Sequence, residues 1–115
     1  MSGVRPTYAQ ETIVTVANGA TESGALRIEA RTVVGLIVGA EFDGTAIGFS
    51  VSRDGSTWVT LTDPDTGNNV AIVAGASEAY SIDPDLLRAF DWVKLIVAAQ
   101  TGVSTIYVYT MPLRA

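Results

Sequence analysis

Residues 46–61 have the pattern of a β-hairpin, and this stretch constrains the fold more than any other. Apolar residues of its first half alternate with small or polar ones, which is the two-residue period of a half-buried strand. The alternating apolar residues are Ile47, Phe49 and Val51. The turn falls at 53–56, where Gly55 can adopt the positive φ that tight turns need. The same period then resumes in 59–61.

Seven other stretches also have strand character, and turn-forming residues separate them. They are rich in β-branched or aromatic residues, or alternate between apolar and polar positions. They are residues 12–17, 25–32, 33–40, 70–74, 78–82, 92–99 and 104–110. Asp83 can cap a single helical turn over 83–90, and Pro84 suits its first position. Eight or nine short strands with one short helical turn predict an all-β, antiparallel β-sandwich or jelly-roll-like fold.

The 115 residues are enough for one domain with its own core. Residues 1–11 are polar and show no period, so we expect a flexible N-terminal arm followed by a single domain over 12–115. Neither a secretory signal nor an apolar run of about 20 residues is present, so we expect synthesis in the cytoplasm and no membrane association.

The composition excludes several kinds of chemistry. A net charge of −5, with only seven basic residues, is a poor match to a phosphate backbone, so we expect no nucleic-acid partner. The absence of cysteine removes disulfides and thiolate metal sites. The absence of histidine removes the usual general base near neutral pH and the commonest metal ligand. We therefore expect neither enzymatic activity nor a cofactor.

Three groups of residues have both a chemical and a structural interpretation. Glu41 and Asp43 could act as an acid–base pair, but acidic residues beside Gly44 are typical of a solvated turn. The loop at 63–69 has the oxygens of a calcium site, yet lacks the spacing of an EF-hand and is typical of an exposed turn. Aromatic side chains could form a sugar-stacking platform, or serve as core and interface residues. These aromatics are Tyr8, Trp58, Tyr80, Trp92, Tyr107 and Tyr109.

Two patterns predict a subunit interface. Residues 33–40 are apolar on both faces, which indicates a strand covered on both sides or an edge covered by a neighbouring subunit. In 104–110, Tyr107 and Tyr109 share one face while the opposite face is also bulky. This is more apolar surface than a small monomer needs to bury, so we expect a homo-oligomer.

Residues 52–58 resemble the Asp-box of sialidases and related propellers, with one residue missing between the aspartate and the glycine. The Asp-box is a folding turn rather than a catalytic motif, and this chain is too short for a propeller. The resemblance implies that Asp54 bonds the turn amides and that Trp58 packs on the turn, without glycosidase activity.

A wider part of the chain, from about 41 to 98, resembles the small all-β structural proteins of tailed bacteriophages. The resemblance rests on Phe49–Leu61, on the acidic loop at 63–65 and on Trp92–Leu95. It implies a virion structural protein, and within a virion we favour a capsid decoration or cement protein that binds the outer head surface and stabilises the shell.

On this interpretation the partner is the major capsid protein, and the protein is located on the capsid surface. The arm, with Arg5 and Tyr8, would lie along the capsid, while the alternating charges of Arg27, Glu29 and Arg31 would set the register. A trimer would suit a position where three capsomers meet. The alternatives are a jelly-roll carbohydrate-binding module and a head–tail or tail accessory protein.

Overall fold

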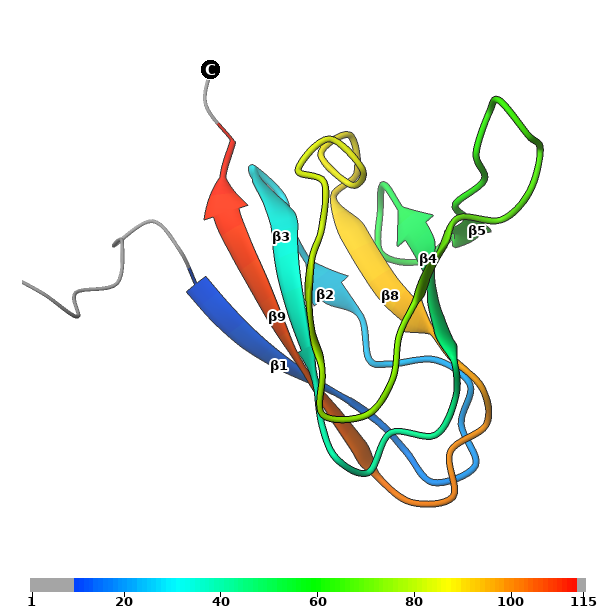
Figure 1. The fold of residues 1–115 in the computed structure, drawn as a ribbon. Coiled ribbons are helices and arrows are strands. Elements are labelled where there is room, and N and C mark those ends of the chain that lie inside the picture. Colours follow the sequence, from blue (N-terminus) through cyan, green and yellow to red (C-terminus); the bar gives the residue numbers. More distant parts are fainter. Residues whose placement is uncertain (1–9, 114–115) are drawn as a thin grey trace, which may run out of the picture.

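The computed structural model describes residues 10–113, which form nine β-strands in two antiparallel sheets packed face to face (Figure 1). Sheet A has the order β1 (Gln10–Val16), β9 (Ser104–Pro112), β3 (Arg31–Val38) and β7 (Ala79–Ser81). Sheet B has the order β2 (Leu26–Arg27), β8 (Trp92–Ile96), β4 (Ala46–Ser52) and β5 (Val59–Thr60), and β6 (Ala71–Val73) also pairs with β4. The predicted antiparallel β-sandwich is confirmed. Within this range no helix is long and apolar enough to cross a membrane.

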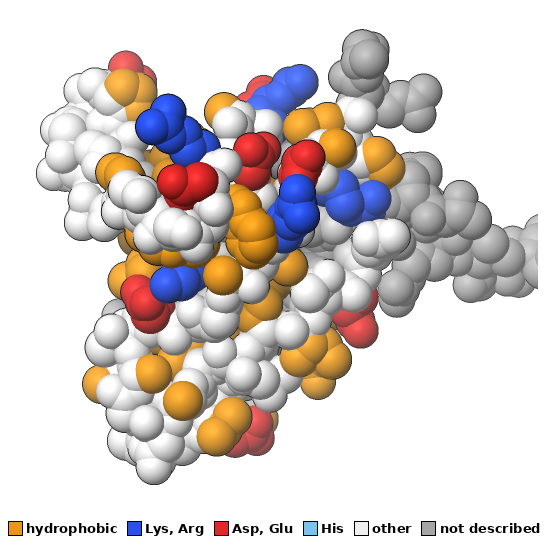
Figure 2. All heavy atoms as spheres, turned by 180° about the vertical axis from the view of Figure 1, so that it is seen from behind, with side chains coloured by type: hydrophobic (Ala, Val, Ile, Leu, Met, Phe, Trp, Pro, Cys, Tyr) orange, Lys and Arg blue, Asp and Glu red, His pale blue; other side chains and the backbone are white. Residues whose placement is uncertain are grey.

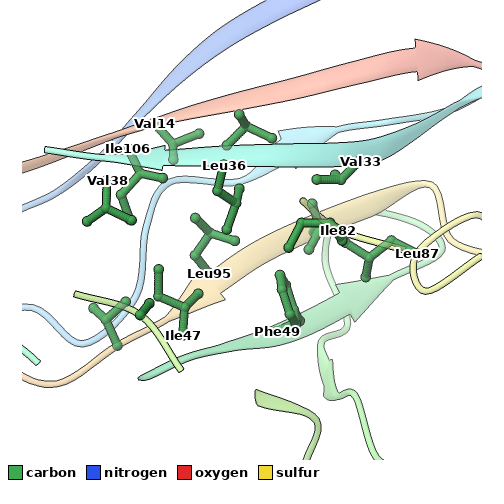
Figure 3. Packing of buried hydrophobic residues seen from close by; sticks show 14 of the residues in the cluster. Val14, Val33, Leu36, Val38, Ile47, Phe49, Ile82, Leu87, Leu95 and Ile106 are labelled. Atoms are coloured by element: carbon green, nitrogen blue, oxygen red, sulfur yellow. The ribbon is translucent and has the colours of Figure 1, made fainter. Parts of the chain in front are cut away.

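The core lies between the two sheets, where alternate residues of each strand point inward (Figure 3). Sheet A contributes residues such as Leu36 and Ile106, and sheet B contributes Ile47, Phe49 and Leu95. Phe49, predicted as the apolar centre of the hairpin, is completely buried. The alternation that indicated the hairpin in the sequence therefore reflects the inward face of β4.

The segment at 25–32 is not the single strand that its alternation predicts. It forms the two-residue β2 in sheet B, turns, and enters β3 in sheet A. Ala30 has a φ of 62° at the turn, and the Arg31 N–H donates to the Ile28 carbonyl at 2.7 Å. A chain that crosses between sheets must break its strand, and alternation continues across such a break without revealing it.

Ala30→Gly is expected to leave the free energy of unfolding unchanged or to raise it by up to about 1 kcal/mol, because glycine removes the left-handed strain of alanine. The control is Ala46→Gly at an exposed position of β4, where the change should cost about 0.5–1 kcal/mol. Urea unfolding of the two variants and the wild type measures this difference. Equal destabilisation by both substitutions would contradict the strain at Ala30.

Residues 83–90 form two tight turns instead of the predicted helical turn. The Leu86 N–H donates to the Asp83 carbonyl at 3.0 Å, and the Phe90 N–H donates to the Leu87 carbonyl at 3.2 Å. The Asp83 side chain caps the first turn by accepting from the Asp85 N–H at 2.9 Å, as its position indicated. The segment crosses from sheet A to sheet B and buries Leu87 completely, and these turns replace a continuous helical hydrogen-bond ladder.

Buried Gln100 joins the turns at one end of the sandwich. Its side chain donates to the carbonyls of Asp43 and Ala98 at 2.7 Å each, and accepts from the Asp43 N–H at 2.9 Å and from the Ser104 hydroxyl. These four bonds use the full capacity of the amide. Its backbone also bonds the turn at 19–20. One residue, 2% exposed, therefore links the segments at 19–20, 43 and 98–104 through its side chain and backbone together.

β1 begins at Gln10, so residues 10 and 11 of the predicted arm belong to a strand. Residues 1–9 lie outside the described residues.

Candidate interaction site

The outer face of sheet A is largely uncharged, and we call it the apolar face. Strand register places its side chains in two parallel rows across all four strands. The first row is Ile13, Tyr107, Ile37 and Ala79, and the second row is Glu11, Tyr109, Gly35 and Ser81. Ile13 is 55% exposed and Ile37 is 39% exposed, although strand residues of this size are more often covered. Exposed apolar side chains that lie next to one another on a sheet face can mark a surface that binds another protein.

The two rows differ in height. Three large side chains make the first row a ridge, whereas Gly35 leaves a hollow in the second row beside Tyr109. The single carboxylate of the face, that of Glu11, accepts a 2.6 Å hydrogen bond from the Tyr109 hydroxyl. The apolar face is therefore a ridge beside a row that is low at Gly35 and Ser81 and high at Tyr109, with its charge at one edge.

The outer face of sheet B has a different character, and we call it the cation–aromatic face. It comprises Glu22, Arg27, Glu29, Trp58, Trp92 and Lys94. The Lys94 ammonium lies 4.4 Å from the centre of the Trp58 ring and pairs with Glu22 at 3.2 Å. The Arg27 guanidinium lies 5.6 Å from the centre of the Trp92 ring and pairs with Glu29. Figure 2 shows basic, acidic and apolar side chains side by side on the back of the molecule.

The cations limit what the two tryptophans can bind. Each ring has a positive group over it, which is a favourable arrangement in itself. A side chain at position 55 would meet the Trp92 ring at 3.0 Å, so the ring also lies against the hairpin turn. Sugar stacking needs an open ring face, and these contacts do not favour the carbohydrate-binding alternative.

Asp54 organises the turn between β4 and β5, as the Asp-box resemblance implied. Its Oδ1 accepts from the N–H groups of Ser56 and Thr57 at 2.8 and 2.9 Å and from the Ser52 hydroxyl at 3.0 Å. These hydrogen bonds to the charged form lower the pKa of Asp54 to about 2. The aromatic ring in contact with Gly55 is that of Trp92, whereas the Trp58 ring lies beneath Lys94.

The lowered pKa predicts a pH-dependent effect of Asp54→Asn. A carboxylate whose pKa is lower in the folded state stabilises the fold above its unfolded pKa, and this contribution is lost as the pH falls through the folded pKa. The variant should therefore be less stable than wild type at pH 7, and the difference should shrink between pH 4 and about 2. Urea unfolding at pH 7, 4, 3 and 2 measures this difference.

Asp65→Asn is the matched control, because the Asp65 carboxylate accepts none of the hydrogen bonds found within residues 10–113. It should leave the free energy of unfolding within about 0.5 kcal/mol of wild type. A gap between wild type and Asp54→Asn that stayed constant from pH 7 to pH 2 would show that the charge of Asp54 has no role.

The three charges expected to set a common register do not share a face. Arg27, in β2 of sheet B, pairs with Glu29. Arg31 begins β3 in sheet A and donates to the side-chain and backbone oxygens of Thr110 at 2.9 and 3.0 Å. The sheet change at Ala30 separates it from the other two. Arg5 and Tyr8, the two arm residues proposed as contacts, lie outside the described residues.

Two of the acidic residues considered for catalysis or metal binding, Asp43 and Asp63, have structural partners. The Asp43 carboxylate accepts from the Thr101 hydroxyl at 2.6 Å and from its N–H at 3.0 Å, and these bonds lower the pKa of Asp43. In the 63–69 loop, Asp63 Oδ1 accepts from the Asp65 N–H at 2.8 Å, which closes the turn favoured from the sequence. The described part of the chain contains no group of three or more acidic residues that could hold a metal ion.

A groove on the inner side of β5 was not predicted from the sequence. The β5 hairpin and the following loop project from the body of the sandwich (Figure 1). A hollow of about 490 Å³ lies there, with Val59, Leu61 and Phe90 in its wall and Arg53 among its lining residues. Val59 is 63% exposed. In the sequence, Val59 and Leu61 continue the two-residue period of the hairpin. Only the arrangement of strands shows that the hairpin extends beyond the opposite sheet.

Comparison with known proteins gives similarity in fold. No family model matches the sequence, and no curated protein matches it. The crystal structure of the SPBc2 prophage-derived protein YomS has a TM-score of 0.55 and 16% identity, over 94% of this chain and 98% of that chain. A chain from the disulfide-linked pili of Bacillus endospore appendages has a TM-score of 0.43 and 12% identity, over 92% of this chain and 88% of that chain. The chain therefore shares its fold, across almost its full length, with YomS.

Proposed function

We propose that this chain is a virion structural protein, and specifically a capsid decoration protein that binds the outer surface of a phage head and stabilises the shell. The observation that carries the proposal is the presence of two dissimilar contact faces on opposite sides of one sandwich. One is apolar and centred on Tyr107, and the other carries the paired charges around Trp58 and Trp92. A protein that bridges neighbours in an assembly needs two such faces, whereas a small monomer has use for neither.

The fold supports the phage setting, because a protein of similar fold is prophage-derived. The residues support a binding role without catalysis, since the Asp43 carboxylate is bonded to Thr101 and the Asp63 carboxylate holds its own turn. On this proposal the protein is made in the host cytoplasm, contacts the major capsid protein, and acts without a cofactor. Because it binds the assembled shell and not its separated subunits, it stabilises the shell by mass action.

The cation–aromatic face is the part we assign to the shell. Arg27 and Glu29 are exposed and carry opposite charges, so they can pair with complementary charges on a capsomer and fix orientation. Reversing both charges, with Arg27→Glu and Glu29→Arg, preserves the internal pair while inverting the pattern presented to the shell. The expected result is weaker binding to purified heads with a small fall in melting temperature, because Arg27→Glu also removes the cation over the Trp92 ring.

Copy number in purified particles tests the proposal most directly. Quantitative mass spectrometry on particles of the phage that encodes this chain should find hundreds of copies, in a fixed ratio to the major capsid protein. A handful of copies would assign the chain to the head–tail junction or the tail and overturn the decoration role. Absence from the particle would overturn the virion proposal as a whole.

A further inference from the structure

We infer that the apolar face of sheet A binds a second copy of this chain, face to face about a two-fold axis. The proposed function assigns no partner to this face, and the inference supplies one. The inference can be tested independently of the virion role. The occupant is indicated by three properties of the face, which are its relief, its charge and its size.

The relief of the face is self-complementary. An isologous contact requires one patch to fit against itself. A two-fold axis that runs across the strands, between the two rows, places the first row of each copy over the second row of the other. Strand register then brings Ile37 of one copy over Gly35 of the second, where the missing side chain leaves room. Tyr107 of one copy likewise faces Tyr109 of the second, as in the offset aromatic contacts of protein cores.

The charge of the face favours its own copy over the capsid shell or another charged partner. Neither row contains a basic residue. The one acidic residue of the two rows, Glu11, already accepts a hydrogen bond from Tyr109. In the two-fold arrangement the two Glu11 carboxylates do not oppose each other, because each lies over Ile13 of the other copy. A contact of this kind resembles an interface between identical subunits, which is less charged than an interface between transient partners.

The size of the face sets the strength of the contact. Four strands of seven, nine, eight and three residues, about 4.8 Å apart with a rise of about 3.3 Å per residue, give a footprint of roughly 400 Å² before side-chain relief is added. This is near the lower end of specific interfaces, where each partner contributes about 600 Å² of accessible surface. We therefore expect a dissociation constant on the order of micromolar, which tethering on a common shell would strengthen through effective concentration.

Gly35→Val tests the fit without disturbing the monomer. A Cβ at position 35 would lie 3.4 Å from the nearest atom, the Tyr80 carbonyl oxygen, and 3.9 Å from Tyr109 Cβ, which are ordinary contacts. Valine also suits a strand better than glycine does. Its side chain fills the hollow that receives Ile37, so we expect the dissociation constant to rise roughly tenfold or more, while the melting temperature does not fall.

Ile37→Lys is the second variant, because it places a charge on the ridge. Val73→Lys is its matched control on β6, where Val73 is 83% exposed and lies in sheet B. Sedimentation equilibrium of the full chain, from about 1 to 200 µM, measures the mass of each protein across the expected micromolar dissociation constant. Wild type and Val73→Lys should approach twice the 12.0 kDa monomer mass, whereas Gly35→Val and Ile37→Lys should remain monomeric.

Other results would overturn the inference. A wild-type chain that stays monomeric across this range has no such contact. A trimer excludes a two-fold pair. A dimer that survives both sheet A substitutions uses another surface. None of these outcomes changes the copy number in virus particles, so the failure of the dimer and the failure of the virion role can be told apart.

Discussion

Phe49→Ala is expected to lower the free energy of unfolding by about 3–5 kcal/mol, which is a large part of the stability of a domain of this size. Phe49 lies on the inward face of β4 and has no solvent exposure. Figure 3 shows its ring pointing from β4 into the space between the sheets. Alanine removes the apolar transfer energy of the ring and leaves a cavity that two hydrogen-bonded sheets cannot close.

Graded substitutions separate the cavity from other effects. Phe49→Leu should cost less than Phe49→Ala, because it retains most of the buried volume. Val59→Ala, on the same hairpin at a largely exposed position, should change the stability by no more than about 0.5 kcal/mol. Urea unfolding followed by tryptophan fluorescence gives all three values. A loss below about 1 kcal/mol in Phe49→Ala would contradict the packing described for the core.

Gln100→Leu is expected to cost about 3 kcal/mol or more, although the two side chains are similar in size. The substitution leaves three polar groups without their partner, and each buried orphan costs about 1–3 kcal/mol unless water reaches it. The groups are the Asp43 N–H and the Asp43 and Ala98 carbonyls, whereas the Ser104 hydroxyl keeps the Glu41 carbonyl as a partner at 3.3 Å. Thermal and urea unfolding measure the loss. Gln10→Leu, at an exposed position of β1, is the control.

Gln100→Glu distinguishes the lost donor from lost packing. The glutamate keeps both acceptor positions but cannot donate to the two carbonyls, so its pKa should be raised in the folded state. A carboxyl with a raised folded pKa destabilises the fold at high pH, and this cost fades as the pH falls through that pKa. The gap to wild type should therefore narrow on acidification. If the free energy of unfolding of Gln100→Glu differs from that of wild type by the same amount at pH 7 and pH 4, the donors of Gln100 are not needed.

Strand positions could be predicted from the sequence, because alternation and turn residues are local properties. The hairpin around Phe49 and the turn held by Asp54 both depend on a few neighbouring residues. The chain crossing at Ala30 could not be predicted, since the same alternation suits one strand or two halves in different sheets. The prediction of a helical turn at 83–90 was wrong, because the capping residues act only on the first turn. The burial of Leu87 determines the path of the remaining residues.

The surfaces were predictable only in part. Apolar residues on both sides of 104–110 indicated a surface beyond the core, and β9 does present Tyr107 and Tyr109 on the outer side of sheet A. Which residues lie beside them depends on strand order, and Ile13 and Ile37 come from distant parts of the sequence. The same applies to Gln100, whose partners lie in separate turns.

The position of β9 has a consequence for how the protein is made. Of the nine strands described here, β9 is synthesised last, yet it lies between β1 and β3 and pairs with both along most of its length. Until the ribosome has released residues 104–112, the seven residues of β1 have no neighbour in sheet A. The complete sheet A therefore assembles only after β9 has left the ribosome. A premature stop would remove the middle of the sheet, so truncated chains should be degraded or aggregate instead of surviving as shortened domains.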